Sequence, residues 1–491
     1  MKNLRSISLL LLFSASASAQ TFADFLARLN ATPLNQRPAL VDSFMNAVPA
    51  FPFLEQDTLA HFIYRGNANT ITVPGDANNW NPAGSPMTRV EGTDFWYRSE
   101  DYEEDARLDY KFVLNGSNWI LDPRNPFTVT GGYGPNSELR MPAYIMPPEI
   151  LYYGYIFHGT TEDTLFYSIN MGNSRTIRVY LPSGYQASAQ DYPIILFHDG
   201  LEYTTLASAI NVLDYLIHYE FIEPVIAVFV PPVNRTEEYA GSFQNQFTNF
   251  IINEVIPWVD TKYRTISLPE KRAVLGASNG GNISLWLALN HPEVFGSVAA
   301  QSSNIQNSIS SGFQNMPLLD LKLYLDIGTY DIPILIQLVN NFIPLLQTKG
   351  YPYQYQVYHE GHSWGNWRAH IDNALIMFFP GSATNLGTSY KSPAEYKLSQ
   401  NYPNPFNSTT VISWQVPGPV QGGDGQLVVG SHVTLTVYNL QGQKVVSLIN
   451  QRLSAGSHSV AWDASGLASG VYLYRLETER DVETRKMILM K

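Results

Sequence analysis

The sequence of 491 residues contains no cysteine, and only 15% of its residues are charged. Without cysteine the chain has no disulfide bond, no thiolate metal ligand and no thioether-linked haem. The ten histidines are scattered without ligand spacing, so we expect no metal site and no cofactor. A net charge of −12 without any basic run argues against non-specific nucleic-acid binding. The hydrophobic content of 45% is instead typical of packed globular domains.

Long apolar runs are also scarce. A membrane-spanning helix needs ~18 or more uninterrupted apolar residues, and no segment after the first twenty approaches this length, so we expect no transmembrane segment. Residues 1–19 have the pattern of a signal peptide. Lys2 and Arg5 form the charged region, "ISLLLLF" is the apolar region, and "ASA" ending at Ala19 offers a cleavage site. The sequence therefore predicts an exported protein.

The pattern of apolar residues changes several times along the chain. Residues 20–55 hold two amphipathic stretches typical of short helices that end in prolines. Residues 56–148 consist of short alternating runs, which predict an all-β immunoglobulin-like sandwich. In residues 149–382, strand-like runs alternate with helical stretches, which predicts an α/β domain with a mostly parallel sheet between two layers of helices. Residues 383–396 are typical of a linker, and residues 397–491 of a second all-β sandwich.

The pentapeptide G-x-S-x-G occurs twice, as "GASNG" around Ser278 and as "GHSWG" around Ser363. In a nucleophile elbow this pattern forms a strained strand-to-helix turn that exposes the serine, and the glycines let neighbouring backbone pass close. In α/β-hydrolases the nucleophile is followed along the chain by the acid and then by the histidine. After Ser363 only His370 and Asp372 remain before the linker, both on one short helical stretch. Chain order therefore favours Ser278 as the nucleophile.

The acid and the base are expected in loops that follow later strands. The stretch "LKLYLDIGTYD" places Asp331 in such a loop, whereas the alternative Asp326 lies within the strand. The stretch "YQYQVYHEGHSW" places His362 in a glycine-flanked loop, with His359 as a competitor nearer the strand end. A serine hydroxyl needs an imidazole to take its proton, and a carboxylate fixes the imidazole tautomer. We therefore expect a catalytic triad of Ser278, Asp331 and His362.

The negative charge of a tetrahedral intermediate needs preorganised hydrogen-bond donors. One is expected to be the backbone N–H of Asn279, which the elbow directs. The second is expected from the loop that follows "PIILFHDG", near Leu201.

Two further residues are candidates for substrate binding. Arg235 follows the strand-like run "VIAVFVPP" and lies on the face of the sheet where such sites assemble. It either meets an anionic or phenolic group of the substrate or forms an ion pair with Glu237 or Glu238. Trp364, two residues after the predicted base, either lines an aromatic pocket or packs into the interior.

Residues 150–380 resemble the esterase D-like branch of the α/β-hydrolases, which includes enterochelin esterases, feruloyl and acetyl carbohydrate esterases, and mycolyltransferases. The resemblance rests on "PIILFHDG", "LGASNGG", "HPEVFGSVAAQSS", "DIGTYD" and "EGHSWGNW". In that family the serine of the elbow, the aspartate of G-x-x-D and the histidine of G-H-x-W form the triad, and these fall on Ser278, Asp331 and His362. The family's backbone donor after D-G falls on Leu201.

The two flanking regions carry resemblances of their own. The first, with "TITVPGDANNWNPAG" and "LNGSNWILDP", resembles early-set domains related to glycogen-binding modules. The sugar-stacking tryptophan of such modules falls on Trp119, with Trp80 as a second candidate, and a purely structural role for either indole stays open. The second, with "LSQNYPNPFNSTTVISWQVP" and "LASGVYLYRLE", resembles the type IX secretion sorting domain. This resemblance implies that the type IX secretion machinery is a partner and that the protein reaches the cell surface or the medium.

Taken together, these features predict a secreted serine carboxylic-ester hydrolase that removes acyl or feruloyl groups from polysaccharide. A siderophore lactone esterase and an acyltransferase are alternatives that use the same triad. A surface adhesin with an idle hydrolase fold is the non-enzyme alternative, and the three filled triad positions disfavour it. Export and the glycogen-binding-like domain favour the polysaccharide substrate.

Overall fold

The computed structural model describes most of the chain from residue 21 onward. The residues described are 21–48, 50–382, 397–398, 400–401, 404–416, 420–421, 427–428, 431–453, 456–478 and 482–490. The predicted signal peptide and the predicted linker lie outside the described residues. Among the described residues no helix is long and apolar enough to cross a membrane. The chain divides into two compact units, Met1–Gly381 and Ser382–Lys491.

The first unit begins with two helices, α1 (Phe22–Ala31) and α2 (Arg37–Ala47). A capping box starts α1, because the hydroxyl of Thr21 accepts the N–H of Asp24 at 3.1 Å and the Asp24 carboxylate accepts the N–H of Thr21 at 3.2 Å. Phe25 and other apolar side chains of the two helices share one core with the all-β domain that follows. The helices therefore cover part of that domain.

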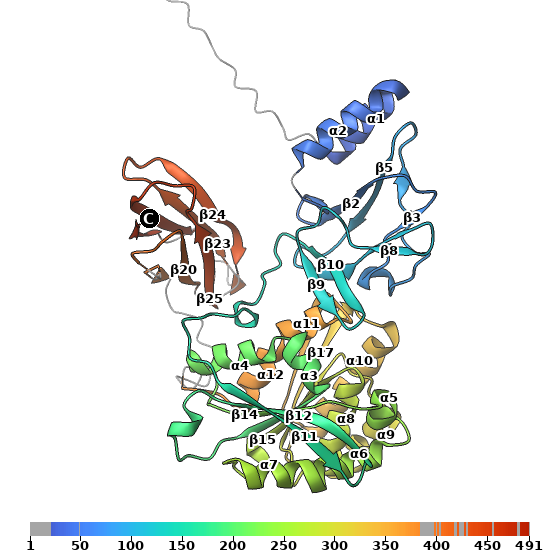
Figure 1. Cartoon of the computed structure of the whole chain (residues 1–491), viewed down its shortest axis with the longest axis vertical. Coiled ribbons are helices and arrows are strands. Elements are labelled where there is room, and N and C mark those ends of the chain that lie inside the picture. Colours follow the sequence, from blue (N-terminus) through green and yellow to red (C-terminus); the bar gives the residue numbers. More distant parts are fainter. Residues whose placement is uncertain are drawn as a thin grey trace, which may run out of the picture. The chain divides into compact units, whose positions relative to one another are not determined.

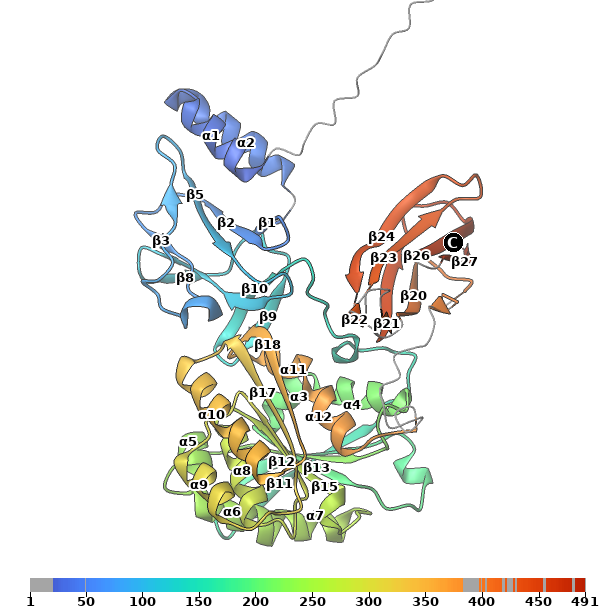
Figure 2. The ribbon, with the colours of Figure 1, turned by 180° about the vertical axis from the view of Figure 1, so that it is seen from behind.

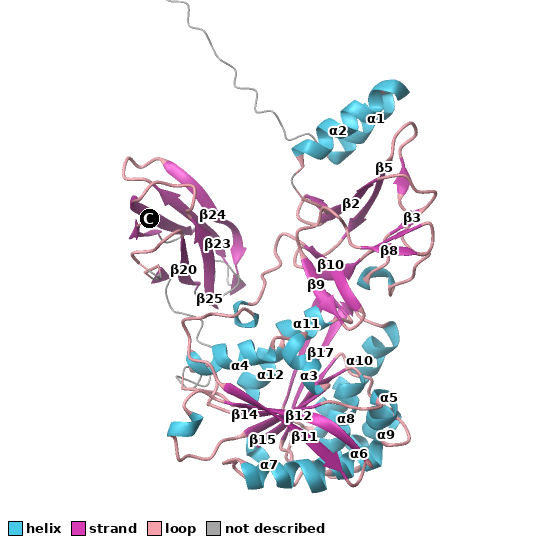
Figure 3. Ribbon diagram, in the orientation of Figure 1, coloured by secondary structure: helices cyan, strands magenta, loops and turns pink. Residues whose placement is uncertain are grey.

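The all-β domain consists of short strands (Figure 3). They are β1 (Phe53–Glu55), β2 (Leu59–Arg65), β3 (Ile71–Thr72), β4 (Thr88–Arg89), β5 (Phe95–Asp101), β6 (Arg107–Tyr110), β7 (Phe112–Leu114), β8 (Asn118–Ile120), β9 (Thr128–Gly131) and β10 (Gly134–Arg140). One sheet has the order β1-β2-β5-β4 and another the order β3-β7-β8, while β6, β10 and β9 belong to a larger sheet.

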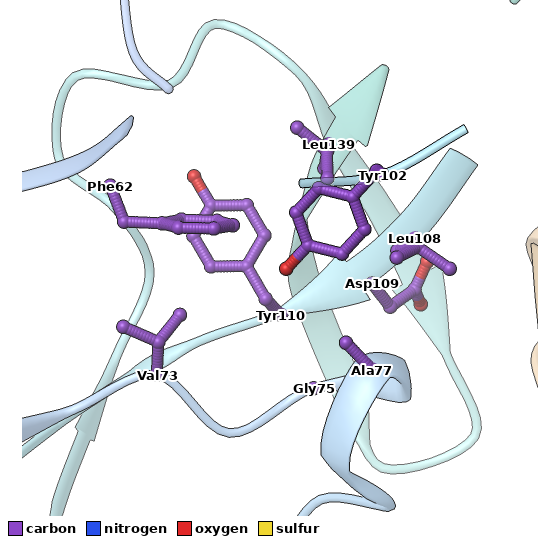
Figure 4. Close-up of a pocket in the computed structure, with 9 residues that line it drawn as sticks. All are labelled: Phe62, Val73, Gly75, Ala77, Tyr102, Leu108, Asp109, Tyr110 and Leu139. Carbon is purple, nitrogen blue, oxygen red and sulfur yellow. The ribbon is translucent and has the colours of Figure 1, made fainter. Parts of the chain in front are cut away.

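A pocket lies inside this all-β domain (Figure 4). It is lined by Phe62, Val73, Gly75, Ala77, Tyr102, Leu108, Asp109, Tyr110 and Leu139. Asp109 is the one charged residue in this lining. None of the residues predicted to act in catalysis lines this pocket. The lining residues Phe62, Val73, Leu108, Tyr110 and Leu139 belong to the hydrophobic core of the domain.

The central domain is built on eight strands. In chain order they are β11 (Thr160–Ser168), β12 (Asn173–Leu181), β13 (Ile194–His198), β14 (Ile226–Val230), β15 (Arg272–Ala277), β16 (Ser297–Gln301), β17 (Lys322–Tyr330) and β18 (Tyr353–Gly361). Their order in the sheet is β11-β12-β14-β13-β15-β16-β17-β18, and the strands from β14 to β18 pair in parallel. This is the mostly parallel sheet that the sequence predicts.

Helices cover both faces of this sheet (Figure 1). They are α3 (Gly200–Thr205), α4 (Ala209–His218), α5 (Arg235–Ala240), α6 (Gln244–Phe250), a π-helical turn (Ile251–Val255), α7 (Ile256–Lys262), α8 (Asn279–Asn290), α9 (Asn307–Asn315), α10 (Pro333–Lys349), α11 (Trp364–Ala369) and α12 (Ile371–Phe378). Alternation along β13 serves both layers: Ile194 and Leu196 pack with α7 to α10, whereas Ile195 and Phe197 pack with α3, α4 and α12. The fold is that of an α/β-hydrolase, as predicted.

The central sheet continues into the all-β domain. Glu360 at the end of β18 pairs in parallel with Arg107 at the start of β6. The combined sheet has eleven strands and ends with the order β18-β6-β10-β9, and Figure 2 shows β18 reaching the strands of the all-β domain. The two domains therefore form one compact unit with a shared sheet.

The second unit is all β. Its strands are β19 (Lys397–Leu398), β20 (Thr409–Val416), β21 (Val420–Gln421), β22 (Leu427–Val428), β23 (Ser431–Tyr438), β24 (Lys444–Leu453), β25 (Gly456–Asp463), β26 (Gly470–Thr478) and β27 (Val482–Leu489). Its two main sheets, β19-β20-β25 and β24-β23-β26-β27, enclose a core that includes Trp414, Trp462 and Tyr474. This agrees with the predicted second sandwich.

We expect a chain that ends at Gly381 to fold without the second unit, because the core of each unit is closed within itself. Its midpoint of thermal unfolding should lie within about 3 °C of the corresponding transition in the full chain, a difference of ~1 kcal/mol. As the control, a chain that ends at Ala369 lacks the buried Ile371 and Leu375 of α12 and should not fold cooperatively. Aggregation of both truncated chains would contradict the division into units.

Candidate active site

Ser278 joins β15 to α8 in a strained conformation. Its backbone angles are φ 57° and ψ −120°, a region that residues with a Cβ atom rarely occupy. Hydrogen bonds hold the turn from both sides: the N–H of Ser278 donates to the carbonyl of Gln301 at 2.8 Å, and the N–H of Asn282 donates to the carbonyl of Ser278 at 3.2 Å. The geometry is that of a nucleophile elbow.

The glycines around Ser278 are needed for close backbone contact. A Cβ atom on Gly276 would lie 2.4 Å from the carbonyl carbon of Gly280, and one on Gly281 would lie 2.8 Å from Oγ of Ser303. The strand and the helix therefore meet at a distance that only glycine allows.

Asp331 and His362 lie directly after neighbouring strands and form a hydrogen bond. Nδ1 of His362 donates to Oδ1 of Asp331 at 2.8 Å. The Asp331 side chain is 0% exposed and that of His362 is 22% exposed, so the carboxylate is shielded while the imidazole reaches the surface. With its Nδ1 proton held in this way, the ring has Nε2 available to take up a proton.

The competing residues have other partners. Asp326 accepts the side-chain amide of Gln301 at 3.1 Å and the N–H of Ser302 at 3.2 Å, and burial raises its pKa to about 6. His359 pairs with Asp105 of the all-β domain at 2.6 Å. The structure thus joins His362 to Asp331 and leaves both alternatives engaged elsewhere.

The predicted residues share one edge of the sheet. Ser278, Asp331 and His362 follow the carboxyl ends of β15, β17 and β18, and Leu201 follows that of β13. Because these strands are parallel, their carboxyl ends lie along the same edge, which is where sites form in sheets of this type.

Trp367 links the histidine to the elbow. Its ring meets that of His362 edge-on, with 5.0 Å between centroids, and its indole N–H donates to Oγ of Ser302 at 3.0 Å. Ser302 follows Gln301, the residue whose carbonyl accepts the Ser278 N–H. Sequence reasoning did not select Trp367, although it stands three residues after Trp364 and thus nearly one helical turn further along α11.

Trp364 itself packs into the interior. It is only 9% exposed, and its ring meets Tyr203 and Trp367 at centroid distances of 5.2 and 4.9 Å. Of the two roles considered for Trp364, the structure favours packing.

Arg235 is held by an acidic residue that the sequence did not suggest. Its Nε donates to Oδ1 of Asp199 at 2.6 Å, and its Nη2 donates to Oδ2 of Asp199 at 2.7 Å and to the carbonyl of Ala277 at 3.0 Å. The predicted alternative of an ion pair with Glu237 or Glu238 was therefore wrong about the partner. The reason is that Arg235 begins α5 beside the ends of β13 and β15, while Glu238 binds a buried arginine of β12.

The two predicted backbone donors lie at helix starts. Asp199 and Gly200 take φ angles of 58° and 23° in the turn from β13 to α3, and Leu201 follows them. Asn279 is the first residue of α8. The N–H groups in the first turn of a helix have no partner inside that helix, so those of Leu201 and Asn279 are available to an incoming oxygen.

His198 precedes this turn and is unsuited to act as a base. It is completely buried, and burial together with the nearby Arg235 lowers its pKa to about 3. A group with this pKa holds a proton poorly near neutral pH.

Comparison with family models finds one match within each unit. Residues 168–378 match the family described as "Putative esterase", and residues 400–490 match the "Secretion system C-terminal sorting domain". The central domain is thus similar to the esterase family over residues 168–378. The sorting domain indicates export to the cell surface or the medium, as the sequence predicts.

Two relatives illustrate how much of the chain is shared. The chain is 26% identical over 233 residues to the uncharacterized protein YjcH of Bacillus subtilis, which covers 44% of this chain and 97% of that protein. It is 24% identical over 303 residues to an endo-1,4-beta-xylanase/feruloyl esterase of Xylanibacter ruminicola, which covers 58% of this chain and 40% of that protein. The second likeness thus extends over less than half of its relative.

Solved structures show the same fold. The ferric enterobactin esterase of Salmonella typhimurium has 20% sequence identity and a TM-score of 0.60, with 69% of this chain and 98% of that chain covered. The enterobactin esterase of Shigella flexneri has 18% identity and a TM-score of 0.57, with the same shares covered. Both likenesses cover more of this chain than residues 168–378, so they include part of the region outside the esterase family match.

We expect Arg235→Met to slow the turnover of neutral and anionic aryl esters by the same factor, because Asp199 already engages the guanidinium. The variant should also lose ~2 kcal/mol of stability, since it leaves the buried carboxylate of Asp199 without its cation. Steady-state kinetics and thermal unfolding measure both effects. Arg178→Met, which breaks an exposed ion pair with Asp163, is the control and should leave both turnover and thermal stability nearly unchanged. A KM that rises tenfold for the anionic ester alone would show that Arg235 binds substrate.

Proposed function

We propose that the protein is a secreted serine esterase that hydrolyses carboxylic ester bonds. In this proposal Ser278 is the nucleophile, His362 is the general base and Asp331 orients the imidazole. The supporting observation is the 2.8 Å hydrogen bond between His362 and the buried Asp331, at the sheet edge where Ser278 occupies a strained turn. The esterase-family match of the central domain agrees with it.

The reaction follows from the roles of these groups. Nε2 of His362 takes the hydroxyl proton as Oγ of Ser278 attacks the ester carbonyl carbon. The N–H groups of Leu201 and Asn279 donate to the oxyanion of the tetrahedral intermediate. When the intermediate collapses, the alcohol leaves with the proton from the imidazolium, and an acyl-enzyme remains. Water then attacks with the same base, which releases the acid and restores the serine.

We propose acyl or feruloyl groups on polysaccharide as the substrate class. The Xylanibacter relative named as a xylanase and feruloyl esterase supports this choice, as does a sorting domain that sends the enzyme to extracellular polymers. The likeness to enterobactin esterases concerns the fold alone, so it does not favour a siderophore lactone.

Trp119 is the candidate sugar platform. It lies on β8 opposite Val113, and the residue is 42% exposed and absent from the core cluster of the all-β domain. Trp80, in contrast, donates its indole N–H to the buried Asp76 at 2.9 Å. We therefore assign the sugar contact to Trp119 and a structural role to Trp80.

We expect Ser278→Ala and His362→Ala each to lower kcat/KM on a simple aryl ester by at least ~10³-fold, because the two groups act as a unit. Asp331→Asn should lower kcat/KM by a smaller factor than Ser278→Ala. Initial rates over a range of substrate concentrations measure these effects. Ser363→Ala is the matched variant in the other pentapeptide and should retain far more activity than Ser278→Ala. A crippled Ser363→Ala beside a mildly affected Ser278→Ala would show that the elbow has been misassigned.

We expect Trp119→Ala to weaken retention on insoluble xylan about tenfold, or ~1.4 kcal/mol, because an aromatic ring stacked on a sugar contributes about this much. Turnover of a small aryl ester and the melting temperature should hardly change, since the ring is exposed. Phe127→Ala, with an equally exposed aromatic side chain in the same domain, is the control.

Two outcomes would contradict hydrolysis of a polysaccharide-linked ester. If the wild-type protein is retained on no glycan and cleaves cyclic catecholate lactones faster than acetylated xylan or methyl ferulate, the siderophore alternative replaces it. If acyl groups pass to added alcohols in preference to water, the enzyme is an acyltransferase.

A further inference from the structure

The second pentapeptide, "GHSWG" at residues 361–365, lies against the all-β domain. Arg107 of β6 is 0% exposed, and its Nη1 donates to Oγ of Ser363 at 3.1 Å. A Cβ atom on Gly365 would lie 2.1 Å from Cζ of Arg107. The guanidinium therefore occupies the space that a larger residue at position 365 would need, at the start of α11.

The other end of the pentapeptide meets a second side chain of the all-β domain. A Cβ atom on Gly361 would lie 2.1 Å from Cγ of Asp76. This carboxylate is itself fixed, because it accepts the indole N–H of Trp80 at 2.9 Å and the N–H of Asp109 at 2.8 Å. Asp76 and Arg107 thus contact the residues on both sides of His362.

Carboxylates of the all-β domain hold the Arg107 guanidinium in place. Nε of Arg107 donates to Glu138 at 2.5 Å, and its Nη2 lies 2.6 Å from Asp109. Nη1 also lies 3.8 Å from Glu360, the residue before Gly361. Burial opposes the charge of Arg107, but the three carboxylates outweigh it and raise the pKa of Arg107. A buried cation with this many anionic partners cannot shift without leaving a charge unpaired.

We propose that Arg107 and Asp76 are positioning residues that hold residues 361–365 from both sides and so place His362 for its bond with Asp331. This inference rests on the proposed role of His362 as the base. The all-β domain is then an integral part of the catalytic unit and not a detachable binding module. The second pentapeptide is the loop on which that domain docks: its two glycines allow close approach, and its serine supplies a hydrogen-bond acceptor.

Gly365→Ala in the full-length protein tests this proposal without removing a buried charge. Because its anionic partners hold the guanidinium in place, the added methyl group collides with it and pushes the His362 loop away. We expect kcat on a small aryl ester to fall about 10- to 100-fold with KM within about twofold, because small misplacement of a catalytic group costs up to ~10²-fold. The control is Gly154→Ala, whose Cβ atom would meet only the Tyr152 ring at 3.8 Å.

A double-mutant cycle shows whether the loss passes through Arg107. In an Arg107→Ala background the atoms with which the methyl group of Gly365→Ala collides are absent, so the second change should lower kcat less than about twofold further. Arg107→Lys keeps a cation without the planar fork and should give an intermediate kcat. If Arg107→Ala does not fold, Ser363→Ala removes the acceptor while the buried charges stay paired, and it should lower kcat several-fold with KM unchanged.

Two results would overturn the proposal. One is a Gly365→Ala variant that melts at a lower temperature but keeps its kcat. The other is a double-mutant cycle in which Gly365→Ala lowers kcat by the same factor with and without Arg107→Ala. Failure of the proposed function is a different result, because the wild-type protein would then hydrolyse no ester at all.

Discussion

The hydrogen bond between His362 and Asp331 is the contact around which the esterase unit is arranged. It joins the loops after two neighbouring parallel strands, and it needs a carboxylate that is shielded from water beside an imidazole that is not. The parallel sheet brings both loops to one edge, while Trp367 packs edge-on against the ring. The orientation of the imidazole is therefore a property of the packed edge and not of one flexible loop.

The strained backbone of Ser278 is likewise held in place by packing at the edge of the sheet. A left-handed φ at a residue with a side chain costs of order 1–3 kcal/mol and persists only when its surroundings hold it. Here the carbonyl of Gln301 accepts the Ser278 N–H, and Gly276 and Gly281 let β15, α8 and the loop after β16 come within contact distance. The same packing places Asn279 at the start of α8, directly after the strained residue.

Much of this arrangement could be predicted from local pattern. Alternation of strand-like and helical stretches predicted the sheet, and chain order separated Ser278 from Ser363 because only the first leaves room for an acid and a histidine. The partners of Arg235 and Arg107 were harder to predict, because they depend on contacts between residues far apart in the chain. Arg235 pairs with an aspartate 36 positions away, and Arg107 reaches Ser363 across 256 positions. No periodicity or spacing contains that information.

The identity of the nucleophile is tested most directly by covalent labelling. A fluorophosphonate reacts with a serine hydroxyl only when a nearby base activates it, so the full-length protein should gain one phosphonyl group. Peptide mass spectrometry should place it on Ser278, and His362→Ala should abolish the labelling while the protein stays folded. Labelling at Ser363, or no labelling of a protein that hydrolyses esters, would contradict the account.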